Sequence, residues 1–336
     1  MYDPHVTSGG KARDPLGSAY QTGKVFGMRK IGVVQAGSAN VIMKRLVTTF
    51  IAALVGSLAL AGIAWADQTP ALGWNWVCEP VGSAVAVDPI ASFGVKPTAH
   101  LHQPFCTSME STLTLSELRA QPNNTKWAAN PDNPTNAKNL DWIPAPVFLN
   151  NRDAFVPVRH VNYYFRKDPN VPVSAVRPPP NGLKVIVGSP DASGAQAHIG
   201  WRCGLTPDSF FSPTQPDCAN KNLKLVVNFP SCSNGKADSA DHKSHLTWPG
   251  ENGCPDSHPI AIPKMRLEWS LDTNGNRVAF LDRSGKRIAP HADFFNGTPA
   301  AVWEDVIERC LDNPKSVGGC AGTGLEGVTN EEFGSR

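Results

Sequence analysis

The chain has 336 residues, with 31 basic and 29 acidic side chains. Without its first 66 residues it keeps 24 basic and 27 acidic groups, a net charge of −3. This balance excludes the dense basic face that binding to nucleic acid or to an anionic membrane requires.

The start of the chain predicts export. Residues 1–42 are Gly-rich and polar, and we interpret them as a non-native upstream extension. Met43-Lys44-Arg45 then opens an apolar run that ends at Ala64-Trp65-Ala66, the small-x-small pattern of a signal peptidase site. We therefore predict a signal peptide over 43–66 and a mature single domain over 67–336, secreted or in the cell envelope, with no stable membrane span after cleavage. An uncleaved anchor is the alternative, because the run is about long enough to cross a bilayer.

All eight cysteines follow the predicted cleavage site. An even number of cysteines in an exported chain indicates disulfides, although eight cysteines allow 105 connectivities. Thiolate binding of zinc is disfavoured, because no Cys-x-x-Cys pair is present. We predict that neighbours pair, as Cys78–Cys106, Cys203–Cys218, Cys232–Cys254 and Cys310–Cys320.

The mature chain carries many short strand-like runs separated by turn residues, at a spacing of roughly ten residues. This pattern predicts a mainly β fold, a β-sandwich or jelly-roll-like single domain with long loops. A helical signal lies in 107–120, capped by Thr114 or Ser116, and the segment 123–139 is predicted to be a loop. The strand-like runs are 142–148, 155–165, 182–188, 198–203, 223–229, 264–271, 278–281 and 287–291.

The C-terminal segment 299–310 is different, because its apolar residues recur at the spacing of an amphipathic helix. We expect this helix to pack on the sheet. The chain has no Walker loop, dinucleotide fingerprint or Gly-x-Ser-x-Gly elbow, so nucleotide chemistry and the common serine hydrolase design lose their usual support.

Two stretches are rich in histidine. In the extended segment 98–102, His100 and His102 are two residues apart and should project to the same face. The segment 228–263 contains three histidines, three aspartates and two cysteines among Gly, Pro and Ser, so it cannot be a long helix. We interpret it as a loop that a Cys232–Cys254 disulfide orders, with its acidic and histidine side chains on one side.

A series of short motifs runs in order through most of residues 74–311. The motifs are Asp88-Pro89-Ile90, His100-x-His102, Tyr163-Tyr164, Pro180-x-Gly182-Leu183-Lys184, Gly188, Trp201-x-Cys203, Phe229-Pro230-x-Cys232, Asp238-Ser239-x-Asp241-His242-x-Ser244-His245, Cys254-Pro255, His258-Pro259, Ile262-Pro263 and His291-x-Asp293-Phe294. In this series the chain resembles the exported DUF1996 family. The resemblance implies an extracellular, glycan-directed setting, because members look like secreted fungal and bacterial proteins that are often joined to carbohydrate-binding modules. The family's name leaves its activity unassigned.

Three interpretations of the histidine and aspartate clusters stay open. A divalent metal would need about three N/O ligands and an open position. A metal-free site would use an aspartate to orient a histidine general base. The same groups could instead satisfy loop backbone atoms, which we favour for His258. The candidate catalytic residues are His100, His102, Asp241, His242, His245, His291 and Asp293, and the candidate metal ligands are His100, His102, His242 and His245.

The predicted partner is an extracellular polysaccharide, and the predicted activity is glycan cleavage by a monomer. Paired aspartates would suit a glycoside hydrolase, whereas a polysaccharide lyase needs only a base and an acid. A non-catalytic carbohydrate-binding or envelope structural protein is the alternative. Tyr163 and Tyr164 face opposite ways on a strand, so at most one lines a site. The candidate substrate-binding residues are Tyr164, Lys184, Trp201, Trp248 and Asp238.

Overall fold

The computed structural model describes residues 73–128, 130–204, 211–219 and 222–312. All of them belong to one compact unit that covers residues 66–336. The predicted upstream extension, the signal peptide and Cys320 lie outside the described residues. No helix of the described part is long and apolar enough to cross a membrane.

The largest sheet has seven strands, and every pairing in it is antiparallel. Because successive side chains of a strand point to opposite faces, one face of this sheet can be apolar and the other polar. In spatial order its strands are β10 (Ile199–Cys203), β11 (Leu223–Asn228), β15 (Lys264–Leu271), β8 (Val158–Arg166), β1 (Gly73–Cys78), β3 (Lys126–Trp127) and β4 (Asn130–Pro134).

A second antiparallel sheet has the order β2 (His102–Phe105), β5 (Asn139–Pro144), β18 (His291–Asn296) and β9 (Lys184–Gly188). The smaller sheets are β17 (Arg287–Ile288), β16 (Val278–Leu281), β6 (Pro146–Phe148) and β7 (Asn151–Phe155), and β13 (Leu246–Thr247), β12 (Cys232–Ser233) and β14 (Ile260–Ala261). The helical elements are α2 (Leu115–Ala120), η1 (Val173–Ala175), α3 (Ala300–Ile307) and η2 (Glu308–Asp312).

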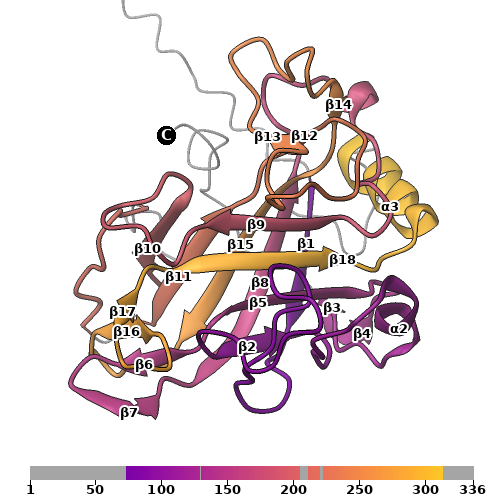
Figure 1. Cartoon of the computed structure of the whole chain (residues 1–336). Helices are drawn as coiled ribbons and strands as arrows, with labels where there is room; N and C mark the ends of the chain where they lie inside the picture. Colours follow the sequence, from indigo (N-terminus) through magenta and orange to yellow (C-terminus); the bar gives the residue numbers. More distant parts are fainter. Residues whose placement is uncertain (1–72, 129, 205–210, 220–221, 313–336) are drawn as a thin grey trace, which may run out of the picture. The chain divides into compact units, whose positions relative to one another are not determined.

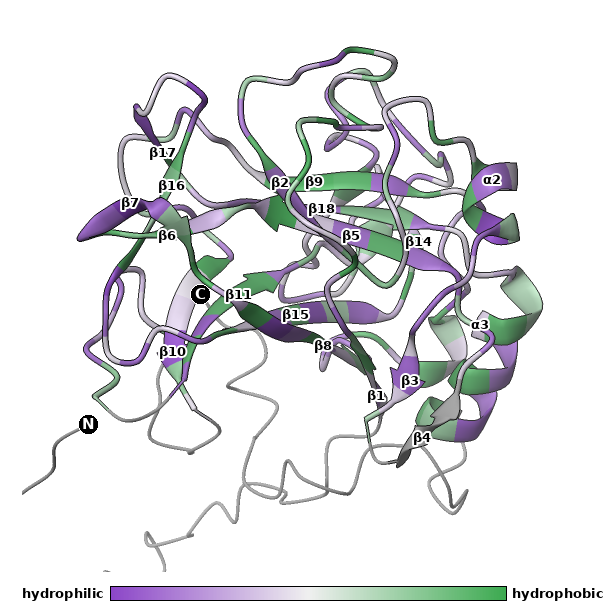
Figure 2. Cartoon of the chain, turned by 90° about the horizontal axis from the view of Figure 1, so that it is seen from below, coloured by the Kyte–Doolittle hydropathy of each residue, from purple (hydrophilic) through white to green (hydrophobic). Residues whose placement is uncertain are grey.

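The seven-stranded sheet and the β2-β5-β18-β9 sheet form two layers, which are seen together in Figures 1 and 2. Their facing sides share one hydrophobic core, to which Phe165 and Trp269 contribute from one layer and Val185 and Phe294 from the other. Trp303 of α3 closes an end of this core against the rings of Trp74, Trp76 and Phe165. The predicted mainly β fold with a C-terminal helix that packs on the sheet is therefore confirmed.

Local sequence signals place several boundaries. Thr114 caps α2 through a capping box with Glu117, so the helix begins eight residues later than the start of the 107–120 signal. The prediction of a loop over 123–139 was wrong in part, because β3 and β4 form a short hairpin there. These strands are only two and five residues long, too short for a clear alternating pattern.

Three of the predicted disulfides are confirmed, namely Cys78–Cys106, Cys203–Cys218 and Cys232–Cys254. The fourth predicted pair includes Cys320 and lies outside the described residues. Several disulfides fit an oxidising, extracellular setting. The Cys232–Cys254 bond closes the histidine-rich segment on itself, as its composition predicted.

The other face of the seven-stranded sheet is polar and buried. Glu268 of β15 lies at its centre and forms ion pairs with Arg202 at 3.1 Å, Lys224 at 3.0 Å and Arg266 at 3.0 Å. Burial would raise the pKa of Glu268, but the charges of the three cations outweigh it and lower the pKa. Glu268 is thus a buried carboxylate whose charge is compensated by three neighbouring cations. We call these four residues the Glu268 cluster.

Candidate metal and acid–base site

The candidate site lies on the face of the β2-β5-β18-β9 sheet that points away from the main core. Along β18, Ala292 and Phe294 enter the main core, so the alternation turns His291 and Asp293 to the opposite face. His102 begins β2 and pairs with Pro144 of β5. Since Asp293 pairs with Trp142 of the same strand, His102 and His291 flank β5 on one face.

Three histidines converge there. The rings of His100 and His102 lie 4.4 Å apart between centroids, which agrees with the prediction that they project side by side. His291 joins them, with its Nε2 atom 3.2 Å from His100 Nε2. One ligand atom from each of the three residues lies within 4.8 Å of the others. Nitrogen donors around one tetrahedral zinc ion are roughly 3.4 Å apart, so the histidines are close to a coordinating arrangement.

Two carboxylates face the same point. Asp293 Oδ2 lies 3.7 Å from His291 Nε2, and Asp88 Oδ2 lies 4.0 Å from His102 Nε2. Asp88 is held by its other oxygen, Oδ1, which accepts hydrogen bonds from the backbone N–H groups of Ile90 and Ala91, both at 2.9 Å. Oδ1 of Asp88 therefore orders the turn that follows it, while Oδ2 faces the histidines. We call His100, His102, His291, Asp88 and Asp293 the histidine centre.

The orientation of His102 is fixed by a hydrogen bond outside the centre. Its Nδ1 donates to the carbonyl oxygen of Val87 at 2.8 Å, which leaves Nε2 as the unprotonated nitrogen of a neutral ring. Metal-bound histidines are typically oriented by such a bond from the second nitrogen. His102 Nε2 itself is buried and has no hydrogen-bond partner, and neither does either carboxylate oxygen of Asp293.

In the histidine centre, burial is the largest cause of every pKa shift, and no neighbouring charge outweighs it. Burial lowers the pKa of His102 to about 4, and burial with the charge of His102 lowers the pKa of His100 to about 4. The pKa of His291 is lowered well below its usual value by burial and by the other two histidines. Burial and the neighbouring Asp88 raise the pKa of Asp293 far above its usual value. The histidines are thus neutral, which is the form that binds metals.

The residues present fit a bound divalent cation. A cation would accept the lone pair of His102 Nε2 and supply the missing partner of Asp293, whose buried oxygens otherwise bear an unsatisfied desolvation cost. Histidine nitrogen with one or two carboxylates suits zinc and the neighbouring first-row divalent ions.

The segment 237–245 does not join the three-histidine cluster. Asp241 is exposed and accepts hydrogen bonds from the backbone N–H groups of Lys243 and Ser244 and from the hydroxyls of Ser239 and Ser244. His245 is buried, and its Nδ1 lies 2.8 Å from Ser239 Oγ. Asp241 and His245 therefore order their own turn, and of the four predicted metal ligands only His100 and His102 lie in the cluster.

His242 differs from those two residues. Its Nδ1 lies 2.7 Å from Asp238 Oδ1, which makes an aspartate–histidine pair on a half-buried ring. Its carbonyl oxygen accepts the N–H of Ile186, the β9 residue that pairs with Asp293. The Nζ of Lys243 donates to the carbonyl of Gly188, the partner of His291, at 2.6 Å. The segment therefore lies along β9 beside the histidine centre. Burial, the largest influence, raises the pKa of Asp88, and the charge of His242 acts in the opposite direction.

Gly188 is required at this junction. Its φ of +91° is in the region that favours glycine, and a Cβ atom there would lie 2.4 Å from Ile199 Cδ1. The chain thus turns at Gly188, immediately beside His291, into the segment that leads to His198.

Lys184 lies on the same sheet face as His291 and Asp293, because it pairs with Phe295 of β18, and its Nζ donates to the carbonyl oxygen of Pro89, next to Asp88. Tyr164, Trp201 and Trp248 lie elsewhere. Tyr164 is on the polar face of the seven-stranded sheet, whereas Tyr163 is in the main core. Lys184 Nζ lies over the rings of Phe93 and Phe295, and Trp201 is buried against Phe280. Trp248 is exposed and stacks on His198 with 3.9 Å between ring centroids.

His258 ties a loop, as its Pro-flanked position indicated. Its Nδ1 lies 2.9 Å from Ser257 Oγ, and its Nε2 lies 3.0 Å from the carbonyl oxygen of Ser244.

Sequence reasoning missed Asp88 as a site residue, and it left His291 out of the metal ligands. The signal for His291 was present, because His291-x-Asp293 repeats the two-residue spacing of His100-x-His102. Asp88 was part of the Asp88-Pro89-Ile90 motif, but nothing in that motif indicated a site residue, since an aspartate before a proline is common in turns.

Residues 88–297 match the model of a domain of unknown function, DUF1996, and the chain belongs to this family. The matched residues include the whole histidine centre and the segment 237–245. No curated protein and no solved structure is similar enough to count as a match.

Proposed function

We propose that His100, His102 and His291, together with Asp293, bind a divalent metal ion, and that the secreted protein uses this centre to cleave an extracellular polysaccharide. The observation that supports the proposal best is the set of buried, unpartnered donor atoms on His102 and Asp293. Buried polar atoms usually have a partner, and here the atoms without one lie beside histidines that could share a metal ion.

A bound metal would act as a Lewis acid that polarises a substrate oxygen. Substrate would approach along His100, because His100 is the most exposed of the three histidines. Asp191 and Asp282 also lie on this side, since their charges act on the pKa of His100, which burial and His102 lower.

Asp238 and His242 would supply the acid–base chemistry. Asp238 accepts the Nδ1 proton of His242, which fixes the tautomer and leaves Nε2 as the base. This arrangement does not require Asp241 or His245 to touch substrate, and their part in the proposal is to hold the turn that carries His242. Hydrolysis and elimination both remain available to a base beside a Lewis acid, and product analysis separates them.

The first test is metal content. Protein purified without a histidine tag, then reconstituted with Zn²⁺ or Mn²⁺ and desalted, should retain about one equivalent of metal. His102→Asn should retain far less, because an asparagine amide can still donate to Val87 O but has no Nε2 atom. His258→Asn, which removes a loop contact only, is the matched control and should bind metal like the wild type. Wild-type protein without stoichiometric metal after reconstitution would remove the metal from the proposal.

The second test is activity on a panel of cell-wall polysaccharides, measured by reducing ends and by the absorbance of unsaturated uronides. His102→Asn and His242→Ala should each lower the rate by 100-fold or more, the usual scale for losing a general base or a metal ligand. His242→Ala should keep its metal. Binding to a polysaccharide without any product, unchanged in His242→Ala, would favour a non-catalytic carbohydrate-binding protein.

A further inference from the structure

The histidine centre lies at the base of a loop whose two ends supply two of its members. Asp88 begins the loop and His100 follows its end, with residues 89–99 between them. The backbone N–H of Thr98 donates to the carbonyl oxygen of Ala86 at 3.0 Å, which closes the loop at its base. The hydroxyl of Thr98 donates to the carbonyl oxygen of His100 at 2.8 Å. The two ends of the loop therefore meet beside the histidine centre.

The residues that lead into the loop also hold His102. Val85 and His102 exchange two backbone hydrogen bonds, of 2.9 and 2.8 Å, and the carbonyl oxygen of Val87 accepts the Nδ1 proton of His102. Asp88 is the next residue. A movement of residues 85–88 would therefore displace Asp88 and His102 together.

The far part of the loop is held by surface contacts. Residues 93–97 are all exposed. An ion pair on the surface joins Lys96 to Glu110 at 2.8 Å, and a backbone hydrogen bond of 2.8 Å joins Gly94 to Ser111. Exposed contacts of this kind add little stability, and segments with few buried contacts open at a low free energy. The order of this part of the loop therefore depends on how firmly its base is held.

We propose that Asp88 is a further ligand of the metal ion, and that the ion, bound between Asp88 and His100, holds the loop closed at its base. This role of Asp88 rests on the proposed function, because it needs a metal in the histidine centre. Asp88 Oδ2 lies 4.0 Å from His102 Nε2. Donors about 2.1 Å from a six-coordinate ion are about 3.0 Å apart when adjacent and about 4.2 Å apart when opposite, so this separation suits two ligands of one ion.

The two oxygens of Asp88 would connect the ion to the loop. Oδ1 accepts the N–H groups of Ile90 and Ala91, each at 2.9 Å, and Oδ2 is left for the metal. Carboxylates that bind metals are typically hydrogen-bonded in this way. Asp88 and Asp293 together would also balance the charge of a divalent ion, so the occupied centre would carry no net buried charge, which is costly without a partner.

Metal binding would then stabilise the closed loop. A ligand that binds one state of a segment and not the other shifts the equilibrium toward the state that it binds. In the closed loop the N–H groups of Ser92, Gly94 and Val95 are all hydrogen-bonded to backbone carbonyl oxygens. These three amides should therefore exchange with solvent more slowly when the metal is bound.

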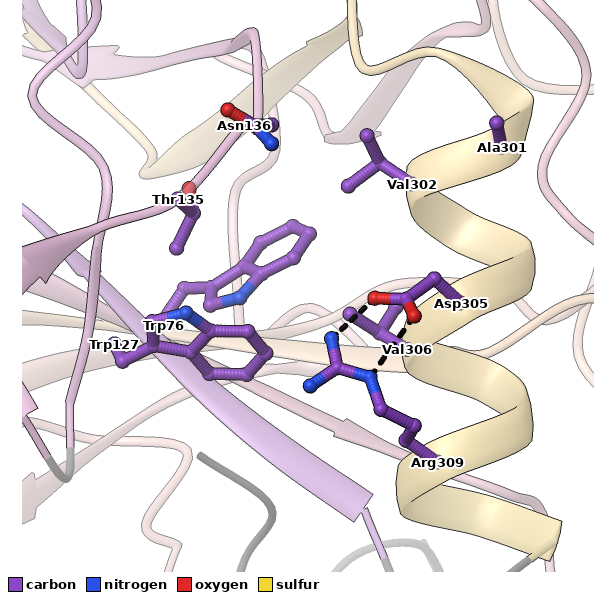
Figure 3. A pocket seen from close by; sticks show the side chains of 9 residues that line it. All are labelled: Trp76, Trp127, Thr135, Asn136, Ala301, Val302, Asp305, Val306 and Arg309. Carbon is purple, nitrogen blue, oxygen red and sulfur yellow. Dashed lines mark hydrogen bonds and ion pairs between the residues drawn. The ribbon is translucent and has the colours of Figure 1, made fainter. Parts of the chain in front are cut away.

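The pocket between α3 and the edge of the seven-stranded sheet supplies a control carboxylate (Figure 3). Among the described residues that line it there is no histidine, and Asp305 is the acid. Asp305 is exposed and pairs with Arg309. A change at Asp305 therefore removes one negative charge without touching the histidine centre.

Hydrogen–deuterium exchange of peptides that cover residues 89–97 tests this role of Asp88, in chelator-treated and in Zn²⁺-loaded protein. In the wild type, loading should slow exchange of the loop amides by about tenfold or more. Asp88→Asn should bind Zn²⁺ at least about tenfold more weakly in competition with a chromophoric chelator. At saturating Zn²⁺ the variant should show no metal-dependent protection of the loop.

Asp88→Asn should fold, because an asparagine Oδ1 still accepts the N–H groups of Ile90 and Ala91. Asp88→Ser is a second variant without the charge, since a serine hydroxyl can also accept a backbone N–H in a turn. Slow exchange in β15 checks that each variant is folded.

Two further variants are the matched controls. Asp217→Asn makes the same change at an aspartate outside the histidine centre, whose Oδ1 accepts the N–H of Ala219 at 3.0 Å. Asp305→Asn removes the exposed carboxylate of the pocket beside α3. Both should bind Zn²⁺ and protect the loop as the wild type does.

Two outcomes would refute this role of Asp88 and leave the metal site standing. One is a wild type that takes up Zn²⁺ without slower exchange in the loop, and the other is wild-type Zn²⁺ affinity in both Asp88→Asn and Asp88→Ser. A wild type that takes up no Zn²⁺ would instead overturn this role and the metal of the proposed function together.

Discussion

The Glu268 cluster and the histidine centre are both buried polar groups on sheet faces, yet their electrostatics are opposite. Glu268 is surrounded by three cations, and its pKa is lowered despite its burial. Asp293 is equally buried, has no hydrogen-bond partner and has a raised pKa. Burial alone therefore does not mark a functional site. The histidine centre is a candidate because an uncompensated carboxyl group lies there beside three histidines that could share a metal ion.

The largest expected effect comes from breaking the compensated cluster. Glu268→Gln should lower the free energy of unfolding by about 3–5 kcal/mol, since it leaves the buried Arg202, Lys224 and Arg266 without their shared counter-charge. Urea denaturation followed by tryptophan fluorescence measures the loss. A decrease below about 1 kcal/mol would contradict the view that Glu268 compensates these cations.

A smaller effect is expected from pH. In chelator-treated protein, a histidine with a lowered folded-state pKa is protonated more readily in the unfolded state, so stability is present above pH 6.5 and lost as the pH falls toward 4. For His102, with a pKa of about 4 in the folded protein, the loss between pH 7 and pH 4 is about 3 kcal/mol. Denaturation at several pH values measures it.

His102→Asn supplies the control for this pH dependence. The variant should show a shallower decline over the same range, because asparagine does not titrate. An equally steep decline in His102→Asn would mean that other groups cause the acid sensitivity.

The smallest effect on stability is expected at Asp293. In metal-free protein, Asp293→Asn should change the free energy of unfolding by less than about 1 kcal/mol, because burial raises the pKa of the carboxyl group and so favours its neutral form, whose shape an amide nearly matches. The same variant should bind Zn²⁺ about 10- to 100-fold more weakly.

Asp293→Asn and Glu268→Gln together test the difference between the histidine centre and the Glu268 cluster. The two substitutions make the same chemical change at two buried carboxyl groups, and only one of them should destabilise the protein. If Asp293→Asn destabilised metal-free protein as much as Glu268→Gln does, Asp293 would be a structural residue with a compensating partner in solution.

The sequence by itself determined the class of fold, and it indicated disulfides without fixing their connectivity. The predicted strand over 264–271 is β15, and the three disulfides that the structure describes join neighbouring cysteines as expected. The strand-like runs stopped at residue 291, so β18 was missed. The two-residue spacing also placed His100 beside His102, since side chains of an extended segment repeat every second residue.

Only the tertiary structure decided which groups meet. The sequence offered the segment 237–245 as the partner of His100 and His102, because histidine and aspartate are dense there. The strand register brought His291 and Asp293, which the sequence had offered as catalytic residues and not as metal ligands, and His291 is about 190 residues from His100, which it contacts at 3.2 Å. A segment rich in histidine and aspartate can be an ordered turn as well as part of a site. Whether distant residues share a site depends on which strands are neighbours. Strand order is set by packing of the whole core rather than by any one segment.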